Sequence, residues 1–294
     1  MSDRFSRRRF VRVTGGAAAA ASIAAPSLVR AAAAGEERHV NVVIVGAGLS
    51  GLMAGRELRK LGIESFVVLE ARDRVGGRTL NMPIGEGHIV EVGGEWIGPG
   101  QDAIAALIDE LGIGAFDQFY EGDTTYDIEG LISRGFIPDV SFSEAADFAK
   151  LAWKIDRLCK KMPVGEPWRM NDAVALDQIT LGDWLREHAA TSFTPSVFRL
   201  ISRAVWSGYP ERISLLWVLQ YLRSAGGLLP VILNDGGAQD QRIEGGSQVI
   251  SERMASELGD RVLLGRPALR IEDPAAGTMR VVTPVETFTA DRVV

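Results

Sequence analysis

Three glycines in one short turn are the first residues of this chain whose types and spacing could do chemistry. Residues 46–51 read GAGLSG and directly follow the apolar, largely β-branched run at 39–45. In such a turn the first glycine allows a tight bend, the second lets backbone approach a pyrophosphate, and the third allows close helix–strand packing. A helix that begins here offers unpaired N–H groups to phosphates. The pattern predicts a dinucleotide-binding turn.

Two strands and a helix must position this turn. The run at 39–45 shows no polar alternation, which is typical of a parallel strand buried on both faces. A helix is expected from the turn to about Leu61, and a second strand over 65–69 ends on Glu70. An acid at this point accepts hydrogen bonds from ribose hydroxyls, and its charge disfavours a cofactor with a 2′-phosphate. Strand, turn, helix and acid together predict a Rossmann-type βαβ unit.

A basic loop containing glycine follows the acid. Residues 71–79 read ARDRVGGRT, so Arg78 comes directly after a glycine pair. A guanidinium fork suits phosphate geometry, whereas a solvated basic loop is the plain alternative. The position directly after Glu70 favours contact with the cofactor. A second segment, IVEVGGEWIGPGQ at 89–101, also contains a glycine pair, which lets main-chain groups reach a ligand without side-chain obstruction.

The middle of the chain is rich in helical patterns. Residues 102–111 predict an amphipathic helix, and Thr180 to Asp183 predict a capping box. The run at 213–222 is apolar on nearly all faces and predicts a buried helix. No repeat or low-complexity tract interrupts this region.

Four segments together resemble the flavin monoamine oxidase family. They are EARDRVGGRT at 70–79, the segment at 89–101, ERISLLWVLQYLRSAGG at 211–227 and GGAQDQRIEGGSQVISERMASELGDRVLL at 236–264. The resemblance implies an α/β fold, in which a Rossmann-type FAD-binding domain has a helix-rich substrate domain inserted. The first part of the FAD-binding domain is expected over 39–115, a partial substrate domain over 116–242, and an incomplete return to the FAD-binding domain over 243–294.

The resemblance also implies which residues hold FAD. The expected contacts are Gly46, Gly48, Leu49, Ser50, Gly51, Glu70, Ala71, Arg72, Gly76, Gly77, Arg78, Gly93, Gly94, Glu95, Trp96 and Ala268. An ordinary core position is the alternative for Trp96. On the substrate side Ile201, Val205 and Gln239 are expected, and it is left open whether Ala238 or Gln239 faces the substrate. No catalytic residue is assigned, because no acid–base pair is visible.

The reaction that the resemblance implies is FAD-dependent oxidation of a primary amine or amino acid. A neutral amine gives a hydride equivalent to the flavin, and the imine hydrolyses to an aldehyde and ammonia. Dioxygen or another electron acceptor then reoxidises the flavin, and dioxygen yields hydrogen peroxide. A non-catalytic FAD-binding fragment is one alternative, and another FAD-dependent oxidoreductase of the same fold is a second. The loops at 71–79 and 89–101 argue against an NAD-dependent dehydrogenase.

The end of the chain has the pattern of strands. Segments 261–264, 279–283 and 286–290 have strand character, and 291–294 begins a further apolar run. In the family this run continues, and the remainder supplies a lysine beside the flavin, a second FAD-binding segment and an aromatic pair. The resemblance therefore implies a C-terminally truncated chain, whose last strand is expected to leave an unpaired edge that favours aggregation.

The first 34 residues have the order of an export signal. The twin arginine Arg7-Arg8 precedes an alanine-rich apolar run at 13–29 and a small-residue stretch at 31–34. This order resembles a twin-arginine signal, which predicts the twin-arginine export machinery as a partner and a periplasmic or extracellular destination. A disordered basic tail is the alternative. A stable membrane anchor is not expected, because the run is shorter than the ~20 residues of a span.

Composition narrows the remaining partners. The 294 residues carry a formal charge of −6, which becomes −11 without the six arginines and one aspartate of residues 1–34. Such a surface repels phosphate backbones, so no nucleic-acid partner is expected. The single cysteine, Cys159, excludes an internal disulfide, and His39, His88 and His188 lack ligand spacing. We therefore expect no metal site.

Overall fold

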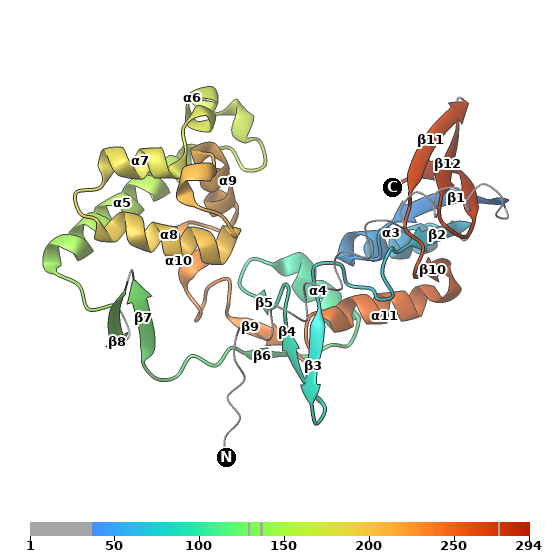
Figure 1. Ribbon diagram of the computed structural model, residues 1–294, viewed down its shortest axis with the longest axis horizontal. Coiled ribbons are helices and arrows are strands. Elements are labelled where there is room, and N and C mark those ends of the chain that lie inside the picture. The colour runs from blue at the N-terminus through green and yellow to red at the C-terminus, as the bar shows by residue number, and fades with distance from the viewer. Residues whose placement is uncertain (1–36, 129, 136–137, 276) are drawn as a thin grey trace, which may run out of the picture. The chain divides into compact units, whose positions relative to one another are not determined.

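The computed structural model describes residues 37–128, 130–135, 138–275 and 277–294. These residues form two compact units, which Figure 1 colours by residue number. Unit 1 contains the described residues up to Glu95 together with Gly245–Val294, and unit 2 contains Trp96–Glu244. The export signal expected over residues 1–34 lies outside the described residues. No helix in the described part of the chain is both long and apolar enough to cross a membrane.

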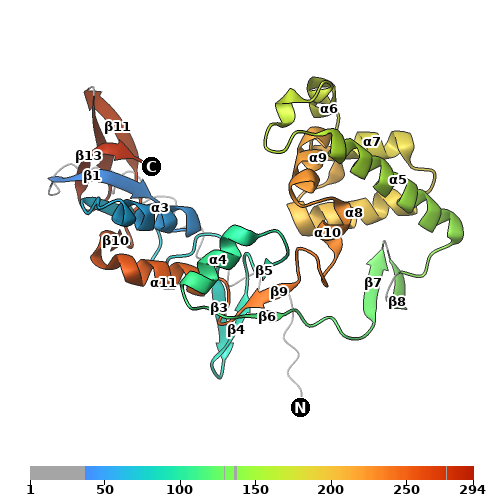
Figure 2. The same cartoon turned by 180° about the vertical axis from the view of Figure 1, so that it is seen from behind.

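A six-stranded sheet forms the centre of unit 1, with the strand order β10-β2-β1-β13-β12-β11. Its strands are β1 (Glu37–Val45), β2 (Phe66–Leu69), β10 (Val262–Leu263), β11 (Arg270–Ala275), β12 (Thr278–Val282) and β13 (Thr287–Val293). β1 pairs in parallel with β2 and β13, β10 is parallel to β2, and β12 runs antiparallel to β13 and β11. The predicted α/β fold with its parallel βαβ unit is confirmed (Figures 1 and 2).

The last strand differs from the prediction. The strand expected over 286–290 and the separate run expected over 291–294 are joined in one strand, β13 (Thr287–Val293), inside the sheet. It pairs with β1 on one side and β12 on the other, and Phe288 and Ala290 are fully buried. The expected unpaired edge is therefore wrong. The strand is internal because it pairs with a segment that is distant in sequence: β1 lies beside β13, with Glu37 opposite Thr287.

Two helices of unit 1 pack against each other next to this sheet (Figures 1 and 2). The remaining elements of the unit are α3 (Leu49–Lys60), β3 (Asn81–Gly85), β4 (His88–Glu91), α11 (Gln248–Leu258) and the 3-10 turn η4 (Gly259–Arg261). Gly55 lets α3 approach α11 closely, because a Cβ there would lie 2.9 Å from Leu258 Cδ1. Arg56 is buried at the same contact and donates from Nε to Glu257 Oε2 at 2.7 Å. Helix α3, which follows the glycine turn, is thus fixed by α11.

Unit 2 is mainly helical. Its helices are α4 (Asp102–Glu110), α5 (Phe142–Lys161), α6 (Ala173–Gln178), α7 (Leu181–His188), α8 (Phe193–Trp206), α9 (Leu215–Ser224) and α10 (Leu228–Ile232), with 3-10 turns η2 (Pro167–Arg169) and η3 (Pro210–Arg212). Its strands are β5 (Trp96–Ile97), β6 (Ala115–Asp117), β7 (Thr124–Ile128), β8 (Leu131–Gly135) and β9 (Gln241–Ile243). The helix predicted over 213–222 is buried on one face only. α9 buries Leu215, Val218, Leu219 and Leu222 in the core, and it exposes Trp217 and Tyr221.

The chain passes from unit 1 to unit 2 between Glu95 and Trp96 and returns between Glu244 and Gly245. The assignment of 39–115 and 243–294 to an FAD-binding domain and of 116–242 to a substrate domain stays a prediction. Pairing of short strands explains where the compact units divide. β5 and β6 both pair with β9, so the segment that carries them belongs with β9 in unit 2.

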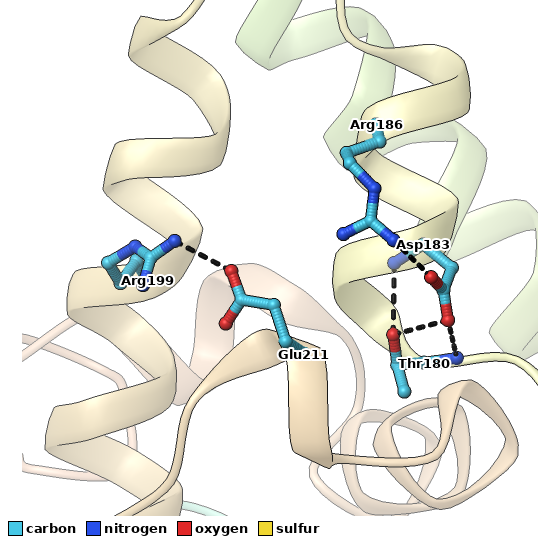
Figure 3. A network of polar contacts seen from close by, with 5 residues as sticks. All are labelled: Thr180, Asp183, Arg186, Arg199 and Glu211. Atoms are coloured by element: carbon cyan, nitrogen blue, oxygen red, sulfur yellow. Dashed lines mark hydrogen bonds and ion pairs between the residues drawn. The ribbon is translucent and has the colours of Figure 1, made fainter.

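Figure 3 shows polar contacts that fix α7 and α8 within unit 2. Thr180 Oγ1 accepts from the Asp183 N–H at 3.0 Å, and Asp183 Oδ2 accepts from the Thr180 N–H at 2.9 Å. This is the predicted capping box, and its hydrogen bonds from Thr180 hold the pKa of Asp183 below its ordinary value. Arg199 Nη2 lies 2.6 Å from Glu211 Oε1 and ties α8 to η3.

Candidate cofactor-binding site

The glycine turn connects β1 to α3, and its glycines have different environments. Gly46 has a φ of +105°, a conformation that side chains rarely adopt. A Cβ on Gly51 would lie 1.9 Å from Gly46 O, so the fold itself requires glycine there. A Cβ on Gly48 would meet only Gly77 Cα, at 3.9 Å, which is an ordinary contact. No atom of the described residues explains glycine at position 48, whereas a pyrophosphate lying against the backbone would explain it.

The first turn of α3 has backbone donors available for that phosphate. The helix begins at Leu49 with Gly48 as its N-cap, and no side chain caps it. The N–H groups in the first turn of a helix have no acceptor within the helix. The amides of Leu49, Ser50 and Gly51, which the sequence predicts as FAD contacts, lie in this first turn, where a helix can bind an anion.

Glu70 joins the glycine turn to the loop after β2. Its side chain is 4% exposed; Oε2 accepts from the Ala47 N–H and Oε1 from the Arg72 N–H, both at 2.9 Å. A carboxylate has about four acceptor positions, so about two remain for ribose hydroxyls. Glu70 thus shapes the turn and also offers acceptors to a ligand, whereas the sequence suggested only the second role. Ala71, between these contacts, is exposed.

The loop at 71–79 keeps its shape through Arg74, a residue for which the sequence predicted no role. Arg72 and Arg78, which it predicted as FAD contacts, are exposed, and their guanidinium groups make no hydrogen bond to the described residues. The Arg74 guanidinium instead donates at 3.2–3.3 Å to the carbonyl oxygens of Val75, Gly77 and Thr79. The sequence holds no signal that separates Arg74 from Arg72, because the choice depends on which carbonyl groups the folded loop turns toward the side chain. Arg74 organises the loop and leaves the other two charges available for phosphate.

This loop lies directly against the glycine turn. Gly48 and Gly76 form an isolated parallel bridge, and the Gly76 N–H donates to Ala47 O at 2.9 Å. Gly76 has a φ of +107°, and a Cβ there would lie 2.6 Å from Thr79 O. The structure therefore brings together the two glycine segments that the sequence assigned to one cofactor.

The loop at 92–95 packs on the first loop. The Gly94 N–H donates to Arg78 O at 3.0 Å, and a Cβ on Gly93 would lie 2.1 Å from the same oxygen. Packing between loops thus requires glycine at 93. Glu95, the last residue of unit 1, is partly exposed.

Ala268 lies on the segment that returns to the sheet beside Glu70. The Arg266 N–H donates to Glu70 O at 2.8 Å, and the Gly265 N–H donates to Arg72 O at 2.9 Å. Ala268 itself is partly buried against the core of the sheet. Unit 1 therefore gathers four sequence-predicted segments around the end of β2.

The other predicted site residues lie in unit 2. Trp96 begins β5, is 41% exposed and donates from Nε1 to Gln118 Oε1 at 2.9 Å, so it is not a core tryptophan within its unit. Ile201 and Val205 are one turn apart on α8, with Ile201 buried and Val205 partly buried against the core. Gln239 is partly buried in the segment between α10 and β9.

The single thiol and the metal-ligating side chains do not form a further reactive centre in the described part of the chain. No group of three or more His, Cys, Asp or Glu residues there is placed to hold a metal ion. Cys159 is buried in the core of unit 2. Burial, followed by the nearby charge of Asp156, raises the pKa of the Cys159 thiol to about 12.

Fold and site together define a protein with a Rossmann-type dinucleotide-binding unit, in which one basic and one uncharged-to-acidic glycine-containing loop lie near Glu70. Comparison of sequences then identifies the family. The chain belongs to the flavin containing amine oxidoreductase family, which matches residues 49–294. The cofactor predicted from the sequence, FAD, is confirmed by this membership.

Individual relatives agree with the family. AofH of Mycobacterium tuberculosis, named for the flavin-containing monoamine oxidases, is 40% identical over 240 residues, which are 81% of this chain and 52% of AofH. Putrescine oxidase bound to putrescine superposes with a TM-score of 0.79 at 32% identity, covering 87% of this chain and 57% of that one. Cyclohexylamine oxidase from Brevibacterium oxydans does so with a TM-score of 0.79 at 29% identity, covering 86% and 57%. The chain spans about half the length of the curated relatives it matches.

Proposed function

We propose that unit 1 binds FAD and that this protein oxidises primary amines or amino acids. Family membership supports flavin-dependent chemistry on amines, and the names of putrescine oxidase and cyclohexylamine oxidase support an amine as substrate. The observation that carries the placement of FAD is the environment of Gly48, where the fold leaves space and has no need of glycine.

Each segment of unit 1 has a part in this proposal. The amides of Leu49, Ser50 and Gly51 bind the pyrophosphate, and the free acceptor positions of Glu70 bind ribose hydroxyls. The exposed guanidinium of Arg78 adds positive charge, which a phosphate site needs in an otherwise acidic chain. Bound FAD supplies the acceptor for a hydride equivalent from the amine. Water then hydrolyses the imine to ammonia and a carbonyl compound, which is an aldehyde from a terminal amine, a ketone from cyclohexylamine and a 2-oxo acid from an amino acid, and hydrogen peroxide forms where dioxygen is the final acceptor.

Reconstitution of the purified chain with FAD tests both halves of the proposal. We expect a folded apoprotein to take up FAD, and an amine panel that includes putrescine and cyclohexylamine to bleach the bound flavin under anaerobic conditions. Peroxide release in air then reports turnover. Failure of a folded apoprotein to bind FAD would overturn the site assignment.

The same experiment distinguishes the amine-oxidising enzyme from the second candidate function, which is an FAD-binding fragment without catalytic activity. This candidate is kept because the chain spans about half of its relatives. It predicts uptake of FAD with no bleaching by any amine or amino acid of the panel. Bleaching by one class alone would narrow the substrate to that class.

We also propose that the twin arginine directs export of the folded protein. The support is the order of charge, apolar run and small residues over 1–34. Replacing Arg7 and Arg8 with lysine is expected to leave an uncleaved precursor in the cytoplasm. Normal export of the double variant would contradict the proposal.

A further inference from the structure

Two polar residues at the start of α11 are buried, although helix termini usually face solvent. Ser247 is 4% exposed and Gln248 is 6% exposed. Both follow the glycine pair 245–246. The side chain of each donates a hydrogen bond to a loop that lies more than 150 residues earlier in the sequence. Those loops are the two cofactor loops of the candidate site, 71–79 and 92–95.

Gln248 fixes the first loop. Its Nε2 donates to Val75 O at 3.1 Å, and its Oε1 accepts from the Asn81 N–H at 2.7 Å. Its aliphatic part lies beneath the glycine pair of the loop, since a Cβ on Gly76 would be 3.1 Å from Gln248 Cγ. One amide group therefore fixes the loop on both sides of its glycine pair.

Ser247 fixes the second loop, and it does so instead of capping its own helix. Serine at an N-cap ordinarily accepts a hydrogen bond from an N–H of the first turn. Ser247 makes no such bond, and its Oγ donates to Gly94 O. Its backbone N–H donates at 2.6 Å to Oε1 of Glu91, a buried carboxylate at the end of β4. The side chain is thus committed to the loop at the expense of the helix.

Both loops need an external support because glycine pairs give them little conformational preference of their own. The buried Val75 carbonyl accepts from Gln248 as well as from Arg74, and the carbonyl of the exposed Gly94 accepts from Ser247. Ser247 and Gln248 supply these donors from a single helical turn. The two loops therefore have a common anchor, in addition to the Gly94–Arg78 hydrogen bond between them.

We propose that Ser247 and Gln248 are positioning residues for FAD, acting through the loops at 71–79 and 92–95. The inference rests on the proposed function, because it takes these loops as the FAD contacts. It assigns to the start of α11 a control over cofactor affinity and over the environment of the bound FAD. Neither side chain needs to touch FAD for this effect.

Three substitutions in the full chain test the proposal. Ser247→Ala removes the hydrogen bond to Gly94 O, and Gln248→Met removes both amide hydrogen bonds while keeping the volume of the side chain. Ser251→Ala is the matched control, because Ser251 is one turn further along α11, is fully buried, and its Oγ has no hydrogen-bond partner among the described residues. Apoprotein melting, the dissociation constant for FAD and the visible spectrum of the bound flavin are measured for each variant.

We expect Ser247→Ala and Gln248→Met to raise the dissociation constant at least tenfold, and Ser251→Ala to stay within twofold of wild type. Ser247→Ala is also expected to shift the flavin absorption bands, which a merely structural role leaves unchanged. Equal affinities and spectra in all variants would overturn the positioning role alone. A wild-type apoprotein that binds no FAD would overturn the proposed function. Loss of folded unit 1 in both variants would show that the fold itself requires these side chains, which also overturns the inference.

Discussion

Glycines 48 and 51 form a matched pair of substitutions, because the structure assigns them different reasons for being glycine. Gly48 has φ −81° and ψ 179°, an extended conformation that alanine adopts readily. Its Cβ would make one ordinary contact, 3.9 Å to Gly77 Cα, whereas a Cβ on Gly51 would lie 1.9 Å from Gly46 O. We expect Gly48→Ala to fold and to bind FAD poorly, and Gly51→Ala to destabilise the apoprotein itself.

The magnitudes separate the two variants. Alanine at a compatible position stabilises by about 0.4–1 kcal/mol through the unfolded chain, and alanine at an N-cap costs roughly 0.5–1.5 kcal/mol relative to glycine. The free energy of unfolding should therefore change by about 1 kcal/mol or less in Gly48→Ala. Overpacking against a backbone carbonyl in Gly51→Ala costs about 1–3 kcal/mol or more. Loss of one charge-assisted hydrogen bond to the pyrophosphate costs about 1.5–3 kcal/mol, which is roughly a tenfold to hundredfold loss of FAD affinity.

The assay combines two measurements on each apoprotein. Thermal melting reports the fold, and titration with FAD, followed by quenching of flavin fluorescence, reports affinity. Folded Gly48→Ala that binds FAD within twofold of wild type would refute the assignment of the pyrophosphate to this turn. Gly51→Ala with wild-type stability would refute the packing argument.

Three further outcomes are expected. Glu70→Gln places an amide N–H₂ against a backbone N–H donor. The substitution should therefore weaken FAD binding about tenfold or more and also lower the melting temperature of the apoprotein. An unchanged dissociation constant for FAD would count against the ribose contact. Cys159 should resist alkylation at pH 8 until unit 2 unfolds, because its pKa is about 12; stoichiometric labelling of the native protein would contradict its burial. Desolvation raises the pKa of Asp147, but hydrogen bonds from Ala190, Thr194 and Thr191 outweigh it and hold the pKa below the ordinary 3.8. Stability from the ionised Asp147 is therefore complete above that value and is lost as pH falls through the lowered pKa. Asp147→Asn should destabilise unit 2 at pH 7, and the difference in the free energy of unfolding between wild type and variant should be smaller at pH 3. Urea unfolding followed by tryptophan fluorescence measures this difference, since all six tryptophans lie in unit 2. A difference independent of pH would refute it.

Local signals were enough to predict the elements that carry the glycine turn and Glu70. The glycine turn and Glu70 lie on consecutive elements, β1, α3 and β2, so spacing along the chain was enough to relate them. The capping box at Thr180 is likewise a pattern within four residues. Such features depend on neighbours in sequence, and the structure shows them where they were expected.

Features that depend on distant pairing were missed. The position of β13 depends on β1, which is 250 residues earlier at the pair Glu37 and Thr287. The selection of Arg72 over Arg74 could not be decided without knowing which carbonyl groups the loop turns inward. The contacts of Ser247 and Gln248 join a segment that follows unit 2 in sequence to segments that precede it. No periodicity in sequence records contacts of this kind.

The central place of β13 has a consequence for the order in which the protein can be built on the ribosome. When residues 37–95 have been synthesised, unit 1 has only β1 and β2 of its six sheet strands. Unit 2 is continuous in sequence, so its chain is complete while unit 1 still lacks β10 to β13. Pairing of strands so distant in sequence forms slowly. The sheet that supports the glycine turn is therefore completed late. One edge of β1 stays unpaired until β13 has been translated, and during that time the chain must avoid aggregation through this edge.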